Sequence, residues 1–479
     1  MTLPIKKTKI VCTIGPASRD QEILEQMLLV GMNIARINLA HGELEDHRQK
    51  IANIRAASNA TGQRVAIFAD LPGPKIRIGE LNQDPIFLER GQEFVLDTRE
   101  NTGNSGRASI NFEGLPLVVK PGNWIFMNDG FLQLQVESVQ HDQVRCKVIV
   151  GGELRSHQGV NFPGIELGIS ALTAQDRELL KFVAEQDLDG VGESFVQTAQ
   201  DIQDLREAAA ALDYKPMIIA KIERAGALDN IEEILNTSDG IMVARGDLGV
   251  EIPIEKIPIV QKELIRKANL AGKPVITATQ MLESMTHNRR PTRSEATDVA
   301  NAILDGTDCV MLSGETAVGK YPIETVMTMS NLACEAESNI RVSGISETLR
   351  QRQVKEQVSP GDVIALAVYM AIETVQPALV IILANTGATV RRVSRFGLAQ
   401  WIIAPSMNEA TCRRLEFSRG VLPVYTADKS ILATPESRRK YAIQQLDTYG
   451  VDCGSVIMVE GSGTLKAEDT KRIDIIDLG

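Results

Sequence analysis

The sequence contains eight strand–turn–helix units in series, and this repetition limits the folds that the chain can adopt. In each unit a short run rich in β-branched residues is followed by a polar or glycine-containing turn and then by a segment of helical periodicity. The strand-like runs lie at residues 9–14, 33–39, 65–71, 190–196, 217–223, 240–246, 274–280 and 309–314. The amphipathic segments that follow them include 21–30, 173–186, 254–271 and 292–304. Eight strand–helix units in series predict a closed (β/α)8 TIM barrel more economically than an open sheet.

A long interval of different character separates the third strand-like run from the fourth. Residues 72–168 show little helical periodicity, and turn residues at 128–130 and 151–152 punctuate alternating runs at 93–98, 131–139 and 143–150. This pattern predicts a small β-barrel domain inserted at a strand end, where it would act as a lid. The catalytic barrel domain would then comprise residues 1–71 and 169–340.

The last part of the chain predicts a further domain. A charged stretch without helix caps (347–357) precedes renewed strand–helix alternation. The strand-like runs there lie at 380–384, 400–405, 421–425 and 455–460. We therefore expect residues 341–479 to form a C-terminal open α/β domain, which makes the whole chain an α/β protein.

Charge and cysteine content exclude several classes of protein. The 51 Lys and Arg residues are outnumbered by 62 Asp and Glu, and the formal net charge of −11 argues against a nucleic-acid partner. The 6 cysteines show no C-x-x-C spacing, so neither a zinc ribbon nor a disulfide framework is indicated. The longest apolar run, 363–372, is about half of a bilayer span. We expect a cytoplasmic protein with no membrane partner.

Polar side chains gather at the ends of the strand-like runs, where barrel enzymes place their active sites. Lys221 and Glu223 are two residues apart on one strand and so share a face. An ion pair on an exposed edge strand would have the same spacing, but the apolar run 217–220 predicts a strand covered on both sides. The other residues of this kind are Arg36, Asn38, Asp70, Ser194, Asp247, Thr279, Gln280, Ser313 and Glu315.

Glu223 and Asp247 follow neighbouring strands and offer two hard oxygen ligands. Such ligands suit Mg²⁺ or Mn²⁺, with water and substrate oxygens completing the coordination shell. Asp247 also has the position of a helix cap, and the two roles can coexist. Arg36, Arg77 and Lys221 would then face a phosphate, which indicates phosphoryl transfer or enolate chemistry. No Walker-type or protein-kinase glycine loop is present.

The chain resembles pyruvate kinases over essentially its whole length, and five segments carry the match. The resemblance implies a barrel with a hinged β domain and a C-terminal regulatory domain, assembled as a homotetramer. It also implies transfer of the phosphoryl group of phosphoenolpyruvate to ADP, giving pyruvate and ATP. The matching segments are TKIVCTIGPAS (8–18), GMNIARINLAHG (31–42), AKIERAGALDNIEEI (220–234), MVARGDLGVEIP (242–253) and the long run 276–322.

The resemblance further implies individual roles. Lys221 would stabilise the phosphoryl group in transfer, and Arg36 and Ser194 would contact the phosphate. The metal ligands would be Glu223 and Asp247. The substrate carboxylate would meet the hydroxyl of Thr279 and the backbone of Ala244, Gly246 and Asp247. The nucleotide contacts would be Asn38, His41 and Arg77, although a lone histidine in a turn is more often a packed or capping residue.

The proton donor to the enolate is the least defined role. A threonine hydroxyl is a weak acid near pH 7, so Thr279 is expected to act through water and Ser313, with Glu315 beside them.

Several departures from the family pattern cluster at its usual K⁺ site. Asn38 is followed by Ala40, where the family usually has a serine ligand. Asp70 is followed by Leu71, where a threonine is usual, so two hydroxyl ligands are missing. Lys75 stands where potassium-dependent members carry a glutamate. We expect Lys75 to supply the missing positive charge, with Asn38 and Asp70 as remnants of the site, and activity without K⁺.

Other departures concern the nucleotide and one buried charge. Gln158 replaces a usual lysine, and Asn-Asp-Gly at 128–130 replaces a more acidic turn, so nucleotide preference is open. Glu193 points to the strand face opposite Ser194 and should lie against the helices, where a carboxylate is costly.

The C-terminal domain contains a candidate effector loop. The strand-like run 380–384 leads into Asn385–Thr389, and the next segment carries Arg391 and Arg392, an arrangement that suits a phosphate. An ordinary strand-to-helix turn capped by Thr386 has the same sequence pattern. The candidate contacts are Thr386, Gly387 and Thr389.

Two positions of the loop lack the hydroxyl or basic side chain that is usual in the family, and this limits the effectors that we expect it to bind. Ala384 and Ala388 replace hydroxyl and basic residues of the family's sugar-phosphate site, and 460–469 lacks an aromatic–basic pattern. We expect activation by a monophosphate such as ribose 5-phosphate, glucose 6-phosphate or AMP rather than by fructose 1,6-bisphosphate.

Two other functions remain open from the sequence. A Mg²⁺-dependent barrel lyase or aldolase of the phosphoenolpyruvate/pyruvate type also uses a Glu and an Asp around an enolate. A catalytically idle relative that binds metabolites is the other, although the residues at 221, 223, 247 and 279 weigh against it.

Overall fold

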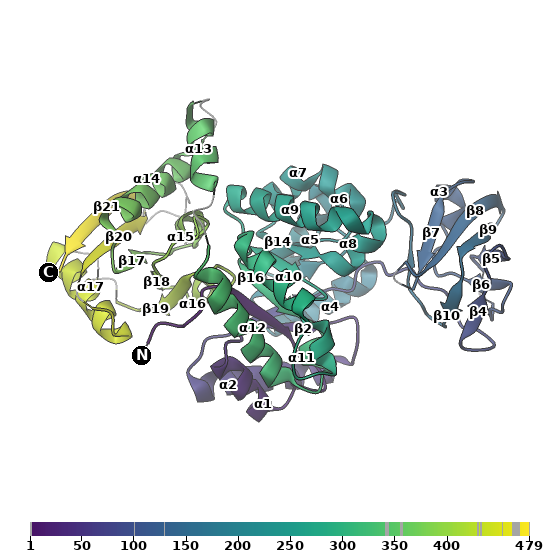
Figure 1. The fold of residues 1–479 in the computed structure, drawn as a ribbon, viewed down its shortest axis with the longest axis horizontal. Coiled ribbons are helices and arrows are strands. Elements are labelled where there is room, and N and C mark those ends of the chain that lie inside the picture. The colour runs from purple at the N-terminus through teal and green to yellow at the C-terminus, as the bar shows by residue number, and fades with distance from the viewer. Residues whose placement is uncertain are drawn as a thin grey trace.

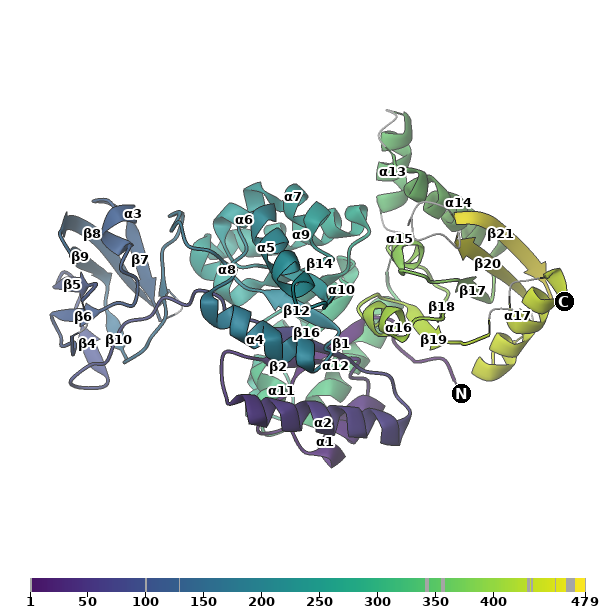
Figure 2. The same cartoon turned by 180° about the vertical axis from the view of Figure 1, so that it is seen from behind.

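The computed structural model describes residues 2–99, 101–128, 130–340, 344–354, 358–428, 431, 434–452, 454–461 and 470–478. Three bodies follow one another along the long axis of the molecule (Figure 1), with the barrel in the middle, the inserted β sheets at one end and the C-terminal sheet at the other. The view from behind shows the same order (Figure 2). No helix in the described ranges is long and apolar enough to cross a membrane.

The eight predicted strand runs form one closed parallel barrel, so the TIM-barrel prediction is confirmed. The ring closes where the first strand pairs with the last, with Lys9 opposite Cys309. Most strand residues are buried on both faces, which is why these runs are continuously apolar. The strands are β1 (Lys9–Thr13), β2 (Ile34–Asn38), β3 (Ala66–Asp70), β12 (Gly190–Glu193), β13 (Met217–Ile222), β14 (Gly240–Ala244), β15 (Val275–Ala278) and β16 (Cys309–Leu312).

Helices cover the outside of the barrel, and the four predicted amphipathic segments are all helical. They correspond to α1, to α4, to a 3-10 turn (Ile254–Lys256) followed by α9, and to α10. The covering helices are α1 (Gln21–Leu29), α2 (Leu44–Thr61), α4 (Ala174–Glu185), α5 (Ala199–Ala210), α6 (Ala225–Asp229), α7 (Ile231–Thr237), α8 (Arg245–Glu251), α9 (Ile257–Ala271), α10 (Arg293–Leu304), α11 (Gly314–Ala317) and α12 (Pro322–Glu337).

The insert between β3 and β12 is built from short strands around its own apolar core, as expected. Its strands pair as a six-stranded sheet, in the order β11-β7-β8-β9-β5-β6, and as a two-stranded sheet of β10 and β4. The elements are β4 (Ile86–Leu88), β5 (Glu93–Asp97), β6 (Arg107–Ser109), α3 (Leu115–Val118), β7 (Trp124–Met127), β8 (Leu132–Gln140), β9 (Gln143–Val150), β10 (Gly152–Leu154) and β11 (Val160–Asn161).

Asp176 joins the two chain segments that connect the insert to the barrel. It occupies the third position of α4 and forms a capping box with Thr173, on the exit segment. Its other carboxylate oxygen accepts a hydrogen bond of 3.2 Å from the backbone N–H of Gly73, on the entry segment. One fully buried carboxylate therefore fixes both ends of the connection.

The C-terminal domain is an open sheet in the order β19-β18-β17-β20-β21. The four predicted strand runs are its parallel strands, and β21 adds an antiparallel edge that the sequence did not suggest. The elements are α13 (Ile345–Val354), α14 (Pro360–Val375), β17 (Leu379–Ile382), α15 (Ala388–Ser394), β18 (Ile402–Ser406), α16 (Glu409–Leu415), β19 (Val421–Tyr425), α17 (Pro435–Tyr449), β20 (Ser455–Gly461) and β21 (Thr470–Asp477).

The charged stretch before this domain is helical rather than irregular over its described part. Helix α13 buries Ile345 and Leu349, which pack into the C-terminal core. The charged residues occupy the remaining faces, so two apolar residues four apart are sufficient to hold the helix in place.

The C-terminal domain also completes the floor of the barrel. Phe417, between α16 and β19, is fully buried in a cluster with residues of the barrel interior. Its ring meets that of Phe68 edge to face, with centroids 6.1 Å apart. Beside it, Lys9 of β1 forms a buried ion pair of 3.2 Å with Glu416.

Glu193 lies against the covering helices, as the alternation of β12 predicted. Its side chain is 1% exposed, and neither carboxylate oxygen has a hydrogen-bond partner in the described structure. Burial raises the pKa of Glu193 well above its usual value, and the nearby Asp176, Asp201 and Asp204 raise it further. Folding therefore favours the protonated form of Glu193 relative to the unfolded chain.

Glu193→Gln should make the protein more stable at neutral and alkaline pH. The unfolded chain releases this proton above about pH 4.5, whereas the folded chain retains it, so stability is lost as pH rises through that interval. The neutral amide removes this loss, so the melting temperature of the variant relative to the parent should be higher at pH 8 than at pH 5. Thermal melting at pH 5 and pH 8 measures it, with Glu185→Gln on the exposed face of α4 as control. A difference between variant and parent that is the same at both pH values would contradict this account.

Candidate active site

The ammonium group of Lys221 lies at the centre of a buried polar cluster at the mouth of the barrel. It is 2.7 Å from the Ser194 hydroxyl, 2.8 Å from Glu223 Oε1 and 3.1 Å from Asp70 Oδ1. The Lys221 side chain is only 12% exposed and both carboxylates are 2% exposed. The spacing of Lys221 and Glu223 thus produces a buried ion pair, and the surface alternative is excluded.

The buried charges of this cluster stabilise one another. Burial alone would lower the pKa of Lys221, but the carboxylates of Asp70 and Glu223 outweigh it and raise the pKa. Burial would raise the pKa of Asp70, but Lys221 and Arg36 bring it below its usual value. Burial raises the pKa of Glu223, which Lys221 only partly offsets. Lys221 is therefore a permanent cation at this position.

Arg36 extends the cluster to the second strand. Its Nε donates to Asp70 Oδ2 at 2.8 Å, a terminal nitrogen contacts the same oxygen, and another donates to Thr13 Oγ1 at 2.9 Å. Asn38, at the end of the same strand, accepts from the backbone N–H of Ala40 at 3.2 Å. Its side-chain oxygen therefore shapes the loop after β2.

A cavity of about 200 Å³ lies between the barrel and the insert. Lys75, Arg77 and Asp247 line it, together with residues of the insert. Partial burial lowers the pKa of His41, as do Lys75, Arg77 and Arg36. Three of the residues that the sequence singled out, Lys75, Arg77 and Asp247, therefore line this cavity, and His41 lies within the electrostatic reach of Lys75 and Arg77.

Gln158 is not among the residues that line this cavity. Its Oε1 accepts from the backbone N–H of Arg155 at 3.0 Å, and it therefore stabilises its own loop. Asp129, in the turn 128–130, lies outside the described residues.

Glu223 and Asp247 are the acidic pair that fits a divalent cation. Among the described residues, no group of three or more His, Cys, Asp or Glu side chains could hold a metal, so water and substrate must supply the other ligands. Burial raises the pKa of Glu223, and the charge of Asp247 raises it further, so the two carboxylates are near enough to repel each other. Glu223 Oε2 accepts from the backbone N–H of Phe195 at 2.8 Å, which orients it. A cation between the two would relieve their repulsion.

Thr279 sits on a strained turn at the end of β15. Thr279 and Gln280 have φ of 67° and 52°, a region that non-glycine residues rarely occupy. The Thr279 hydroxyl accepts from the N–H of Gly246 at 2.8 Å and donates to the carbonyl of Ala278 at 2.7 Å. It therefore connects the ends of β14 and β15.

Arg245 holds that turn in place, and the sequence reasoning missed it. Its guanidinium donates to the carbonyls of Thr279 (2.7 Å) and Gln280 (3.3 Å) and pairs with Asp298 at 2.6 Å. The side chain is only 9% exposed. An arginine directly after the apolar run of β14 was the available signal, because such a charge needs partners at the barrel mouth.

Ser313 and Glu315 lie at the end of β16 in different settings. Glu315 accepts from the backbone N–H groups of Ser313 (2.7 Å) and Leu282 (3.1 Å), so it stabilises two loops. The Ser313 hydroxyl is buried and has no hydrogen-bond partner in the described structure. The Ser313 hydroxyl is therefore available for the proton transfer expected from the sequence, whereas the Glu315 carboxylate is occupied by backbone hydrogen bonds.

The effector loop begins α15, with Gly387 rather than Thr386 at the cap position. Gly387 has φ of 80°, which favours glycine. The carbonyl of Thr386 accepts from Arg391 at 3.3 Å. Arg392 instead lies 3.9 Å from Asp362, so only Arg391 accompanies the loop. Residues 462–469, most of the second loop, lie outside the described residues.

A closed (β/α)8 barrel with a buried lysine and two carboxylates at its mouth defines an enzyme of the barrel class that works on oxyanions. The family model for the pyruvate kinase barrel domain matches residues 5–326, and that for the pyruvate kinase alpha/beta domain matches residues 362–476. The chain belongs to the pyruvate kinase family and is a phosphotransferase.

Individual relatives agree with the family models. A pyruvate kinase of Thermococcus litoralis is 46% identical over 430 residues, covering 88% of this chain and 89% of the relative. One of Staphylococcus aureus is 42% identical over 422 residues, covering 88% and 72%. The crystal structure of a pyruvate kinase from Cryptosporidium parvum has a TM-score of 0.89 at 35% identity, covering 99% and 97%.

The family's standard reaction is the glycolytic transfer of a phosphoryl group from phosphoenolpyruvate to ADP, generally with Mg²⁺ and usually with K⁺. These matches decide against the lyase or aldolase alternative, since all of them name pyruvate kinases.

Arg245→Met should reduce kcat for pyruvate formation about 100-fold and raise the half-saturating concentration of phosphoenolpyruvate. The strained turn would relax without its guanidinium, and misplacement of a substrate-binding group by about 1 Å costs a factor of this size. Steady-state assays coupled to lactate dehydrogenase measure both parameters. Arg293→Met, an exposed arginine on α10, is the matched control. A kcat/KM within threefold of the parent in Arg245→Met would show that the turn at Thr279 keeps its conformation without the guanidinium.

Proposed function

We propose that this chain catalyses the pyruvate kinase reaction with Lys221 as the cation that stabilises the phosphoryl group in transfer. The observation that carries the proposal is the position of its ammonium, within 3.1 Å of Ser194, Glu223 and Asp70 at the barrel mouth. The transition state of phosphoryl transfer spreads negative charge over several oxygens, and fixed cations stabilise it best. Arg36, anchored by Asp70, would bind the phosphate with Ser194.

The metal and carboxylate contacts follow from the neighbouring strand ends. Glu223 and Asp247 would hold Mg²⁺ or Mn²⁺, which supplies positive charge to the substrate oxygens. The carboxylate of phosphoenolpyruvate would bind the backbone of Ala244, Gly246 and Asp247 and the hydroxyl of Thr279. The hydrogen bond from the Gly246 N–H to the Thr279 hydroxyl places the two groups next to each other. To bind the carboxylate, Gly246 would have to give up this bond and Thr279 its bond to the carbonyl of Ala278.

Protonation of the enolate would use Thr279, a water molecule and Ser313. Ser313 has a buried hydroxyl without a partner among the described residues, which leaves it able to donate. Glu315 would orient this segment through the backbone rather than exchange protons.

The insert, residues 72–168, would act as a lid over the barrel domain (1–71 and 169–340), and 341–479 would form the regulatory domain. Asn38, His41 and Arg77 would contact the nucleotide. The positive face formed by Lys75, Arg77 and Arg36 around His41 supports binding of a polyphosphate there.

Activity without K⁺ is part of the proposal. Burial and the charge of Lys221 lower the pKa of Lys75, and the carboxylates of Asp247 and Glu223 act against them. With these two carboxylates as counter-charges, the ammonium of Lys75 would take the place of a bound cation. Ala40 has no hydroxyl to offer a cation, and its backbone N–H donates to the side-chain oxygen of Asn38.

Regulation and assembly complete the proposal. A phosphorylated metabolite would bind at Thr386, Gly387 and Thr389, and a monophosphate is expected to activate better than fructose 1,6-bisphosphate. The assembly would be a homotetramer located in the cytoplasm.

Lys221→Met and Asp247→Asn should each lower kcat by about 10²–10³ or more, because each removes a charge that acts mainly in the transition state. Pyruvate release from phosphoenolpyruvate with ADP measures it. Lys181→Met and Asp229→Asn, which change exposed residues on α4 and α6, are the controls, and circular dichroism checks the fold. Turnover near the parent value in a folded Lys221→Met variant would disprove the role assigned to Lys221. Because that variant would be active, the same result would also count against a catalytically idle relative.

Added K⁺ should leave the rate in Tris buffer unchanged, whereas Lys75→Glu should create a requirement for K⁺. The substitution exchanges the internal ammonium for a carboxylate that needs a counter-ion. Rates with and without 100 mM KCl, and with choline chloride at equal ionic strength, separate K⁺ from salt effects. Strong stimulation of the parent enzyme by K⁺ alone would contradict the proposal.

A further inference from the structure

The side chain of Arg224 links the barrel to the inserted domain at the cleft between them. Arg224 directly follows Glu223 after the end of β13 and is only 7% exposed. Its guanidinium donates to the backbone carbonyl of Ile165 at 3.0 Å. Ile165 lies on the segment 162–168, where the chain returns from the insert to the barrel. A barrel residue next to the candidate metal site therefore holds one of the two connections of the insert.

Ile165 belongs to both bodies at once. Its side chain is buried in the core of the insert, with those of Phe162 and Leu167, whereas its carbonyl is bound by the barrel. Gly164, the residue before it, has φ of 70°, a region that favours glycine, so the chain turns directly ahead of the bound carbonyl. The hydrogen bond from Arg224 is therefore a fixed point from which the insert extends.

Glu251 orients the guanidinium of Arg224. Its Oε2 lies 3.8 Å from Arg224 Nε, and its side chain is only 5% exposed. Glu251 ends α8, four residues after Asp247, so these two carboxylates share one face of the helix, and both line the cavity of the cleft. The insert approaches the same helix at Gly130, where an added Cβ would lie 3.8 Å from Val250 Cγ1. Helix α8 thus carries a candidate metal ligand and the partner of the arginine that holds the insert.

We infer that Arg224, oriented by Glu251, is a positioning residue that sets the insert over the barrel mouth so that Arg77 reaches the nucleotide. Arg77 belongs to the insert and lines the same cavity as Arg224 and Asp247. Displacement of a binding group by about 1 Å is enough to weaken catalysis strongly, so the placement of the insert matters for the reaction. The inference rests on the proposed nucleotide contact of Arg77, and it adds a barrel residue that acts through the insert.

A role limited to charge balance would also account for the ion pair, because a buried Glu251 needs a counter-charge. It would not account for the hydrogen bond to Ile165, since a carbonyl needs no counter-charge. A guanidinium has several donors in one plane and can therefore bind a carbonyl through one nitrogen while another faces a carboxylate. The single ammonium group of a lysine cannot do both at these two positions.

Arg224→Met should raise the half-saturating concentration of ADP about tenfold and leave that of phosphoenolpyruvate within about threefold, because one charge-assisted hydrogen bond to the insert is lost. The proposed phosphoenolpyruvate contacts all lie on the barrel, which explains the difference. Steady-state pyruvate formation by the full chain, with each substrate varied at saturation of the other, measures both values. Arg177→Met, which changes an exposed arginine on α4, is the matched control and should behave like the parent. Thermal melting confirms that each variant is folded.

Two further variants separate positioning from charge balance. Arg224→Lys keeps the positive charge but not both contacts, so it should retain most of the ADP defect. Arg224→Met/Glu251→Gln removes the unpaired carboxylate, so it should recover thermal stability without recovering ADP saturation. ADP saturation equal to that of the parent in either variant would overturn the inference and leave Arg224 as the counter-charge of Glu251.

Arg77→Met distinguishes failure of this inference from failure of the proposed function. A rise in half-saturating ADP in Arg77→Met but not in Arg224→Met would overturn the inference and leave the nucleotide contact in place. No rise in either variant would refute the nucleotide role of the insert, and the inference with it. An equal rise for ADP and phosphoenolpyruvate in Arg224→Met would show general damage to the metal site, and would also overturn the inference.

Discussion

The ion-pair cluster around Lys221 is the constraint to which the rest of the barrel mouth conforms. An ammonium group that is almost entirely buried must have counter-charges, and here they come from β3 and from β13 itself. Asp70 also anchors Arg36 of β2, and Ser194 follows β12, so four adjacent strands end in one hydrogen-bonded network. Removing one member would leave the others as uncompensated charges in an apolar setting, which costs about 3–5 kcal/mol. Register between these strands is thus fixed by electrostatics as well as by the backbone ladder.

The sequence predicted the barrel and the central cluster because both depend on local periodicity. Strands buried on both faces read as continuous apolar runs, and residues two apart must share a face, which is enough to pair Lys221 with Glu223. The remaining features depend on contacts between distant segments. Arg245 stabilises a turn at Thr279 that has positive φ. The residues around Arg245 give no indication of that turn, because it lies more than thirty residues further along the chain. The face of Glu193 follows from alternation, but the lack of a hydrogen-bond partner for its carboxylate among the described residues depends on side chains from distant segments.

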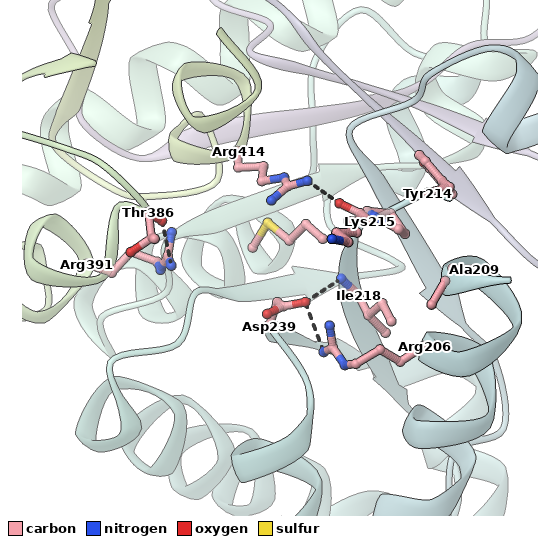
Figure 3. Close-up of a pocket in the computed structure, with 12 residues that line it drawn as sticks. Arg206, Ala209, Tyr214, Lys215, Ile218, Asp239, Thr386, Arg391 and Arg414 are labelled. Carbon is pink, nitrogen blue, oxygen red and sulfur yellow. Dashed lines mark hydrogen bonds and ion pairs between the residues drawn. The ribbon is translucent and has the colours of Figure 1, made fainter. Parts of the chain in front are cut away.

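Cations in two parts of the described structure have different partners. At the barrel mouth Lys221 and Arg36 have carboxylates within reach, and the pKa of Lys221 is raised. Where the C-terminal domain meets the barrel, the hydrogen bonds of Arg391 and Arg414 among the described residues go to carbonyl oxygens (Figure 3), and burial lowers the pKa of Arg391. Carbonyl dipoles orient a guanidinium but do not neutralise it. Carboxylate partners therefore keep the charge of Lys221 fixed whether or not a substrate is bound.

The position of Phe417 in the barrel interior affects how the barrel can fold during synthesis. During synthesis the eight barrel strands leave the ribosome before residue 417, yet the innermost layer of the barrel includes that ring. Until the C-terminal domain emerges, Phe68 and its neighbours face an open floor that water can enter. A nascent chain stopped after β16 would therefore expose apolar surface and depend on chaperones, although all of its strands were already made.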